Sequence, residues 1–88
     1  MADKTFSLEI LTPHRPVFTG AVTSLIAPGT LGSLGVLANH APLVTTLGVG
    51  TVIYRDGEGN PTTLKSAAQG FLEVGENRAV VLLDSLSE

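Results

Sequence analysis

The segment that decides the fold runs from Gly70 to Leu83 and reads GFLEVGENRAVVLL. Its two halves are rich in apolar residues, and the triplet Gly75-Glu76-Asn77 between them is typical of a hairpin loop. The second half ends in four consecutive apolar residues, Val80 to Leu83, which predict a short buried strand. The segment therefore predicts a β-hairpin, and it indicates a protein built from short strands joined by tight turns.

The neighbouring segments predict more strands of the same kind. Residues 6–10 read FSLEI, and this alternation of apolar and polar side chains is typical of a strand with one exposed face. Thr51–Arg55 and Thr62–Ala68 flank Asp56–Pro61, which is a dense turn signal. Val, Ile and Thr make up 22 of the 88 residues, and β-branched side chains pack well on a pleated surface. These features favour an all-β protein.

A longer extended stretch runs from Val17 to Ala27, with Gly20 at a position where we expect a bulge or a bend. Because both alternating sets of Ala21–Ala27 lack charge, we expect that part to be covered on both faces. Residues 28–50 are rich in glycine and predict further short strands. We therefore predict a single domain, residues 1–88, with seven or more short strands in a sandwich or barrel.

Charge is distributed unevenly along the chain. Only 15% of the residues are charged, and the 39 residues from Pro16 to Tyr54 contain no Asp, Glu, Lys or Arg. Such a run must be buried or must contact a partner. Its many Gly and Pro residues exclude a membrane span. The net charge of −3 argues against nucleic-acid binding, and the absence of cysteine excludes disulfides and thiolate chemistry. The first residues lack the features of a signal peptide, which predicts an intracellular protein.

The charge-free run contains two features that resemble functional sites. Residues 29–35 have the glycine spacing GxxGxxG, which matches neither the dinucleotide fingerprint nor a P-loop, so we expect a turn-rich connection. His40 is the run's only titratable side chain, and with His14 as the second histidine a metal site is not expected. Either His40 is a turn residue that bonds the backbone, or it contacts a partner. The spacing supports no catalytic site and no cofactor site.

Lys65 raises one alternative, because small acidic β-domains include carriers that hold lipoate or biotin on a lysine at a hairpin tip. Lys65 lies in a strand-like stretch without turn residues, so we expect it on the exposed face of a strand. A carrier domain modified on Lys65 remains the alternative function, and a ligand-binding sandwich is a weaker third.

The charge-free run also carries a family resemblance. Phe18-Thr19-Gly20 and the segment from Ala27 to Thr45, which reads APGTLGSLGVLANHAPLVT, resemble the epsilon subunit of F-type ATP synthase. Residues 8–13 (LEILTP) are similar to the opening strand of that family, and Gly70–Val74 with Asn77 to its closing hairpin. The core GxLGVLxNHAPL is the most specific part of the resemblance.

The resemblance implies about ten short strands in a two-sheet β-sandwich, within a rotor subunit that catalyses no reaction. Such a subunit links the gamma subunit of the central stalk to the membrane c-ring and couples proton flow to ATP synthesis. It would lie at the cytoplasmic side of a bacterial inner membrane, peripheral and not inserted, or at the stromal side in a chloroplast. The implied c-ring contact comprises Thr30, Leu31, Gly32, Ser33 and His40. The implied gamma contact comprises Thr12, Val44 and Thr45.

The sequence departs from the family pattern in three places. Leu31 and Ser33 stand where acidic residues are common in the family, which predicts a contact with the c-ring that depends little on salt. Ala38 replaces a common proline, at an expected cost of up to about 1 kcal/mol. The sequence ends at Glu88, where most members continue into a hairpin of two helices, so that hairpin is expected to be absent.

Overall fold

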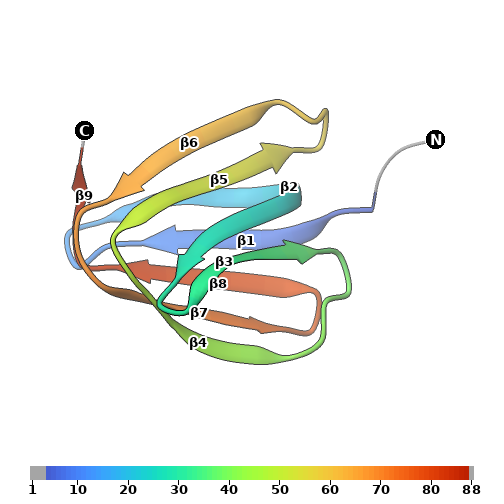
Figure 1. The fold of residues 1–88 in the computed structure, drawn as a ribbon. Helices are drawn as coiled ribbons and strands as arrows, with labels where there is room; N and C mark the ends of the chain where they lie inside the picture. The colour runs from blue at the N-terminus through green and yellow to red at the C-terminus, as the bar shows by residue number, and fades with distance from the viewer. Residues whose placement is uncertain (1–3, 88) are drawn as a thin grey trace.

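The computed structural model describes residues 4–87, which form nine strands and no helix (Figure 1). The strands are β1 (Phe6–Leu11), β2 (Pro16–Gly29), β3 (Gly32–Leu37), β4 (Leu43–Leu47), β5 (Gly50–Asp56), β6 (Pro61–Ser66), β7 (Gly70–Gly75), β8 (Arg78–Leu83) and β9 (Leu86–Ser87). The described residues thus contain no helix that could cross a membrane. The all-β prediction is confirmed, with nine strands where about ten were expected.

The strands form two layers that share β2. One layer has the order β4-β7-β8-β1 and continues through the first half of β2, while the second half of β2 pairs with β3 on one side and β5 on the other. β6 and then β9 extend that second layer. Figure 1 shows the long β2 bridging the two layers. The predicted hairpin is present as β7 and β8, with Glu76 and Asn77 at positive φ in its turn.

The core lies between the layers and consists of the inward side chains of seven strands. Its buried residues are Phe6, Leu8, Ile10, Val22, Leu25, Ala27, Val36, Leu47, Val52, Tyr54, Leu72, Val74, Ala79, Val81 and Leu83. Most of them follow the period of two that strands impose, as Leu8 and Ile10 do in β1. The sequence therefore buries one face of each layer and leaves the other face outside.

The expectation of a bulge at Gly20 is wrong. Gly20 pairs in register with Leu8, and the pairing of β2 with β5 shifts register between Val22 and Ser24 instead. A side chain at Gly20 would place its Cβ 3.0 Å from the tip of the Phe18 ring. That ring packs on Tyr54 with 4.4 Å between ring centroids. Gly20 thus makes room for an aromatic pair.

The register shift also explains why Ala21–Ala27 is not covered on both faces, contrary to expectation. Val22 and Leu25 are both buried although they are three residues apart, because the extra residue changes the side that the strand turns inward. Ile26 on the opposite side is 44% exposed. Burial in the core therefore accounts for only part of the charge-free run.

Candidate interaction surface

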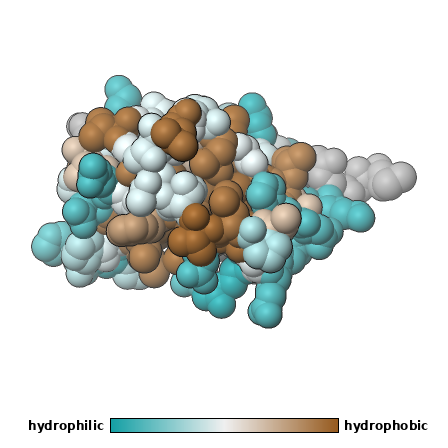
Figure 2. All heavy atoms as spheres, turned by 60° about the horizontal axis from the view of Figure 1, so that its bottom comes forward, coloured by the Kyte–Doolittle hydropathy of each residue, from teal (hydrophilic) through white to brown (hydrophobic). Residues whose placement is uncertain are grey.

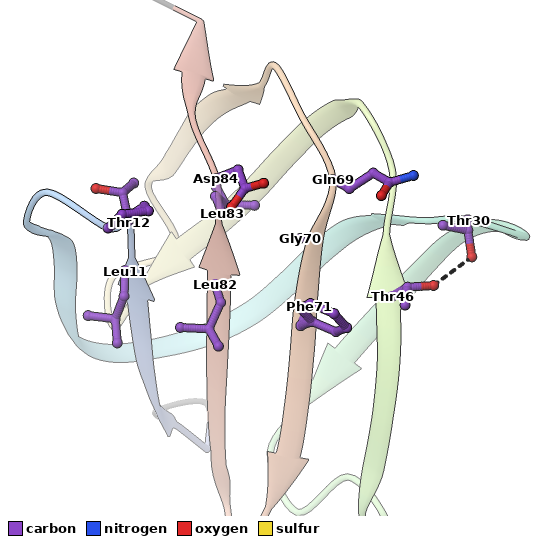
Figure 3. Close-up of a pocket in the computed structure, with 11 residues that line it drawn as sticks. Leu11, Thr12, Thr30, Thr46, Gln69, Gly70, Phe71, Leu82, Leu83 and Asp84 are labelled. Atoms are coloured by element: carbon purple, nitrogen blue, oxygen red, sulfur yellow. Dashed lines mark hydrogen bonds between the residues drawn. The ribbon is translucent and has the colours of Figure 1, made fainter.

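The outer face of the first layer carries a row of four uncharged side chains. In the strand register, Thr46 of β4 lies opposite Phe71 of β7, Phe71 opposite Leu82 of β8, and Leu82 beside Leu11 of β1. Figure 3 shows these four side chains next to one another on neighbouring strands. Phe71 is 55% and Leu82 46% exposed, which is unusual for large apolar side chains at adjacent positions. We call these four residues the apolar row.

The apolar row lines a shallow hollow of about 550 Å³. The other residues around the hollow are Thr12, Pro13, Thr30, Gln69, Gly70, Leu83 and Asp84, of which only Asp84 is charged. Figure 2, which turns the lower edge of Figure 1 toward the viewer, shows hydrophobic residues gathered across the middle of the surface. An exposed apolar surface with a polar rim is typical of a protein-binding site.

Charge begins in the next row of the same face. There Val44, which is 71% exposed, lies opposite Glu73, and Glu73 lies opposite Val80, which is beside Glu9. The Glu9 carboxylate accepts a hydrogen bond from the guanidinium of Arg78. The apolar row therefore occupies the uncharged half of the face, toward the end where β1 and β8 finish.

The turn between β2 and β3 is bonded directly to this face. The Thr30 amide donates to the Thr46 carbonyl over 3.3 Å, and the hydroxyl oxygens of the two threonines are 2.9 Å apart. The Gly48 amide also donates to the Pro28 carbonyl over 2.7 Å. Leu31 at the tip of the turn is fully exposed, and Val49 of the β4–β5 connection is 70% exposed at the same end of the molecule.

The structure brings together four of the five residues predicted for the c-ring contact. Thr30, Leu31, Gly32 and Ser33 lie in the β2–β3 turn or directly after it. His40 lies in the loop that follows the other end of β3, and six residues of strand span about 20 Å. Its Nδ1 donates to the Ala41 carbonyl over 2.7 Å, as the turn-residue interpretation of His40 describes.

The residues predicted for the gamma contact belong to strands of the first layer or lie beside them, but they do not all point to its outer face. Thr12 lines the hollow, and its hydroxyl donates to the Arg15 carbonyl over 2.9 Å. Val44 points outward, whereas Thr45 is the next residue of the strand, points to the opposite side and is half-buried. Among the three, Val44 is therefore the residue most available to a partner.

The exposure of two residues of the apolar row was not predicted from the sequence. Val80–Leu83 was predicted as a buried run, yet the strand alternates, so Val81 and Leu83 are buried while Leu82 is exposed. Phe71 likewise alternates with the buried Leu72. The available signal was the strand period itself, which requires that adjacent apolar residues face opposite sides.

Potential metal ligands and Lys65 are the other candidates for chemistry. No group of three potential metal ligands occurs among residues 4–87. Lys65 lies inside β6, opposite Thr51 of β5 and Ser87 of β9, as predicted for a strand residue and unlike a hairpin tip.

The pKa of Asp56 is lowered because the backbone N–H groups of Asn60 and Glu58 donate to its carboxylate in the β5–β6 turn.

The chain is similar to known proteins over nearly all of its length. Residues 5–88 match the family model described as ATP synthase, Delta/Epsilon chain, beta-sandwich domain. The ATP synthase epsilon chain of Pelotomaculum thermopropionicum is 48% identical over 85 residues, which cover 97% of this chain and 62% of that relative. The epsilon chain of Chlorobaculum tepidum is 40% identical over 86 residues, which cover 98% of this chain and 97% of that relative.

Two solved structures share the fold. A chain in the mitochondrial ATP synthase of Euglena gracilis superposes with a TM-score of 0.88 at 17% identity, covering 99% of this chain and 55% of that one. A chain in the central stalk and c-ring of the Tetrahymena thermophila enzyme superposes with a TM-score of 0.80 at 13% identity, covering all of this chain and 69% of that one.

Proposed function

The chain belongs to the delta/epsilon beta-sandwich family of ATP synthase chains, and from this premise we propose that it is a non-catalytic subunit of the rotor. It links the gamma subunit of the central stalk to the membrane c-ring and couples proton flow to ATP synthesis. It is peripheral to the membrane, on the cytoplasmic side in a bacterium, and it is attached through the c-ring without being inserted.

The apolar row is the observation that carries this proposal. A protein that worked alone would expose Phe71 and Leu82 to water at adjacent positions without benefit, whereas a subunit of a complex buries them against its partner. We assign the gamma subunit to this face because Thr12 and Val44 border it. Since only about half of each side chain is exposed in the free chain, burying the rest contributes roughly 1 kcal/mol for each of the two.

We assign the c-ring to the end of the sandwich at which the β2–β3 turn projects. The fully exposed Leu31 forms the tip, and Thr30 connects the turn to the apolar face through its bonds to Thr46. Because this turn carries no charge, its contact with the ring rests on apolar and hydroxyl groups. Torque that reaches Leu31 is then transmitted to β4 through the two hydrogen bonds between Thr30 and Thr46.

The experiment that tests the gamma assignment uses two valines of equal exposure. Val44 is 71% and Val49 is 70% exposed, but only Val44 lies on the outer face of the first layer, in the row next to the apolar row. Val44→Asp should weaken binding to purified gamma subunit at least tenfold, because a partner that covers this face would bury a second carboxylate opposite Glu73. Val49→Asp should bind gamma like the unmodified chain. If both variants bound gamma as tightly as the unmodified chain, the outer face of the first layer would be excluded as the gamma contact.

A further inference from the structure

The turn between β5 and β6, at the upper right of Figure 1, begins with the sequence Asp56-Gly57. No other Asp or Asn of the 88 residues precedes a glycine. A glycine amide nitrogen can be approached closely, because no side chain stands beside it. Gly57 is exposed, and none of residues 4–87 accepts a hydrogen bond from its amide. The Gly57 nitrogen is therefore free to attack the carboxyl carbon of Asp56.

The carboxylate of Asp56, by contrast, is held by the turn. Its Oδ1 accepts from the Glu58 amide over 2.9 Å and from the Asn60 amide over 3.0 Å. The Gly59 amide closes the turn by donating to the Asp56 carbonyl over 2.9 Å. Attack by Gly57 turns the carboxyl group onto the Gly57 nitrogen, so the bonds to Oδ1 must be given up first.

We propose that Asp56 is a site of isoaspartate formation, which the hydrogen bonds of the turn restrain while the protein is folded. The Gly57 nitrogen forms a bond to Cγ of Asp56, and its proton leaves with the carboxyl hydroxyl as water. Water then opens the resulting succinimide ring. Cleavage of the new bond restores aspartate, whereas cleavage of the original peptide bond leaves isoaspartate, through whose Cγ the main chain continues. The reaction oxidises and reduces nothing, needs no partner and leaves the mass of the chain unchanged.

The turn slows this reaction in two ways. Ring closure gives up both bonds to the carboxylate, and each bond lowers the population of the released form severalfold. The carboxylic acid also loses its hydroxyl more readily than the carboxylate loses an oxygen. Because the Asn60 and Glu58 amides lower the pKa of Asp56, the folded protein holds less of that acid. Together the two effects should slow isoaspartate formation at least about tenfold relative to the unfolded chain.

Isoaspartate at this position would disturb the junction of β5 with β2. Asp56 pairs with Val22 next to the register shift of β2, and its carbonyl accepts from the Thr23 hydroxyl over 3.2 Å. The rearrangement converts that carbonyl into a free carboxylate and lengthens the main chain by one carbon atom. It also consumes the carboxylate that the two amides of the turn bind. Reacted molecules should therefore unfold at a lower urea concentration than unreacted ones.

Two glycines of the turn provide matched variants. A Cβ meets no atom within 4 Å at either Gly57 or Gly59, but of the two only Gly59 has a positive φ, of 87°. Gly57→Ala should keep the turn and form much less isoaspartate, because its methyl group hinders the attacking nitrogen. Gly59→Ala strains the turn that holds the carboxylate, so isoaspartate should form about fivefold faster or more. Peptide mapping with electron-transfer fragmentation, after ageing at neutral pH, measures isoaspartate at residue 56.

The unmodified chain, aged in buffer and in guanidinium chloride, gives a test that does not depend on how any variant folds. Isoaspartate at residue 56 should accumulate at least about tenfold faster in the denaturant. If none forms there, Asp56 is not a modification site. If it forms equally fast in both, the turn does not restrain the reaction. Equal rates for Gly57→Ala and the unmodified chain would show that the Gly57 nitrogen is not the nucleophile.

Discussion

The side chains of Thr30 and Thr46 join two parts of the molecule that are 16 residues apart, with 2.9 Å between their hydroxyl oxygens. Because valine keeps the shape of threonine but lacks the hydroxyl, Thr30→Val and Thr46→Val remove this bond with little change in packing. A double-mutant cycle measured by urea unfolding should give a coupling energy of about 0.5 to 1 kcal/mol. Additive effects of the two substitutions would mean that the hydroxyl bond does not hold the turn to β4.

Asn77 connects three separate segments in a similar way. Its Oδ1 accepts from the Asn39 amide over 2.8 Å, and its Nδ2 donates to the Thr5 carbonyl over 3.0 Å. Asn77 has a φ of 57°, which asparagine tolerates better than most residues. Asn77→Ala should lower the free energy of unfolding by about 2 to 3 kcal/mol.

The matched control at this position is Asn77→Asp. Aspartate keeps the acceptor for the Asn39 amide, but it sets a carboxylate oxygen against the Thr5 carbonyl oxygen in place of the donor, so it should cost about as much as alanine although it retains one bond. Urea unfolding of both variants measures the difference. A loss below about 0.5 kcal/mol for Asn77→Ala would show that the two bonds are replaced by water without penalty.

Two glycines of β7 should differ strongly in how much stability the same substitution costs. A Cβ on Gly70 would lie 2.2 Å from the Leu82 carbonyl oxygen, whereas a Cβ on Gly75 meets no atom within 4 Å. Because the obstacle at Gly70 is backbone, β8 must move to relieve it. Gly70→Ala should cost about 3 kcal/mol or more, and Gly75→Ala less than about 0.5 kcal/mol. Thermal unfolding that ranks the two variants equally would contradict this local geometry.

The sequence predicted the strands well because each of them follows local rules. The glycine and asparagine of the 75–77 loop and the turn residues of 56–61 fix the hairpins, and both are present. The face that each strand buries was harder to predict. A single extra residue between Val22 and Ser24 reverses the exposure of Ile26, and such a shift depends on pairing with a distant strand, β5.

Prediction of the candidate surface depends even more on the pairing of strands that are distant in the sequence. Leu82 and Val81 are equally apolar, so only the neighbouring strands decide which of them faces water. The bonds between Thr30 and Thr46 have no local signal at all. The family resemblance pointed to the turn and to β4 as contact regions, but it could not show that His40 lies at the other end of β3.

Asp56 should make stability depend on pH in the acid range. Donation from the Asn60 and Glu58 amides lowers its pKa from the usual value near 3.8, so the folded protein favours the carboxylate. The resulting stabilisation is fully present above the unfolded pKa and is lost as the pH falls through the lower folded pKa. Asp56→Asn cannot titrate, so its stability relative to the unmodified protein should rise as the pH falls from 5 to about 3. Urea midpoints that change in parallel would exclude this contribution.

Leu31 and His40 together test which end of the sandwich meets the c-ring. Both were predicted to contact it, but Leu31 is at the tip of the β2–β3 turn and His40 follows the far end of β3. Leu31→Asp introduces a charge at a fully exposed position, so the domain should fold normally. Acidic residues are common at this position in the family, but the uncharged turn of this chain is expected to meet an uncharged part of the ring. A carboxylate there should therefore weaken binding to membranes that contain the c-ring about tenfold, and proton-coupled ATP synthesis should fall with it.

His40→Ala is the counterpart of Leu31→Asp, because it removes one local hydrogen bond to Ala41. It should change stability by less than about 1 kcal/mol and leave binding to the ring unaffected. Binding to gamma should be equal for both variants and the unmodified chain, which separates a defect at the ring from a defect at the stalk. If His40→Ala weakened ring binding as strongly as Leu31→Asp, the ring would have to contact the β3–β4 loop as well. The contact would then extend over both ends of β3.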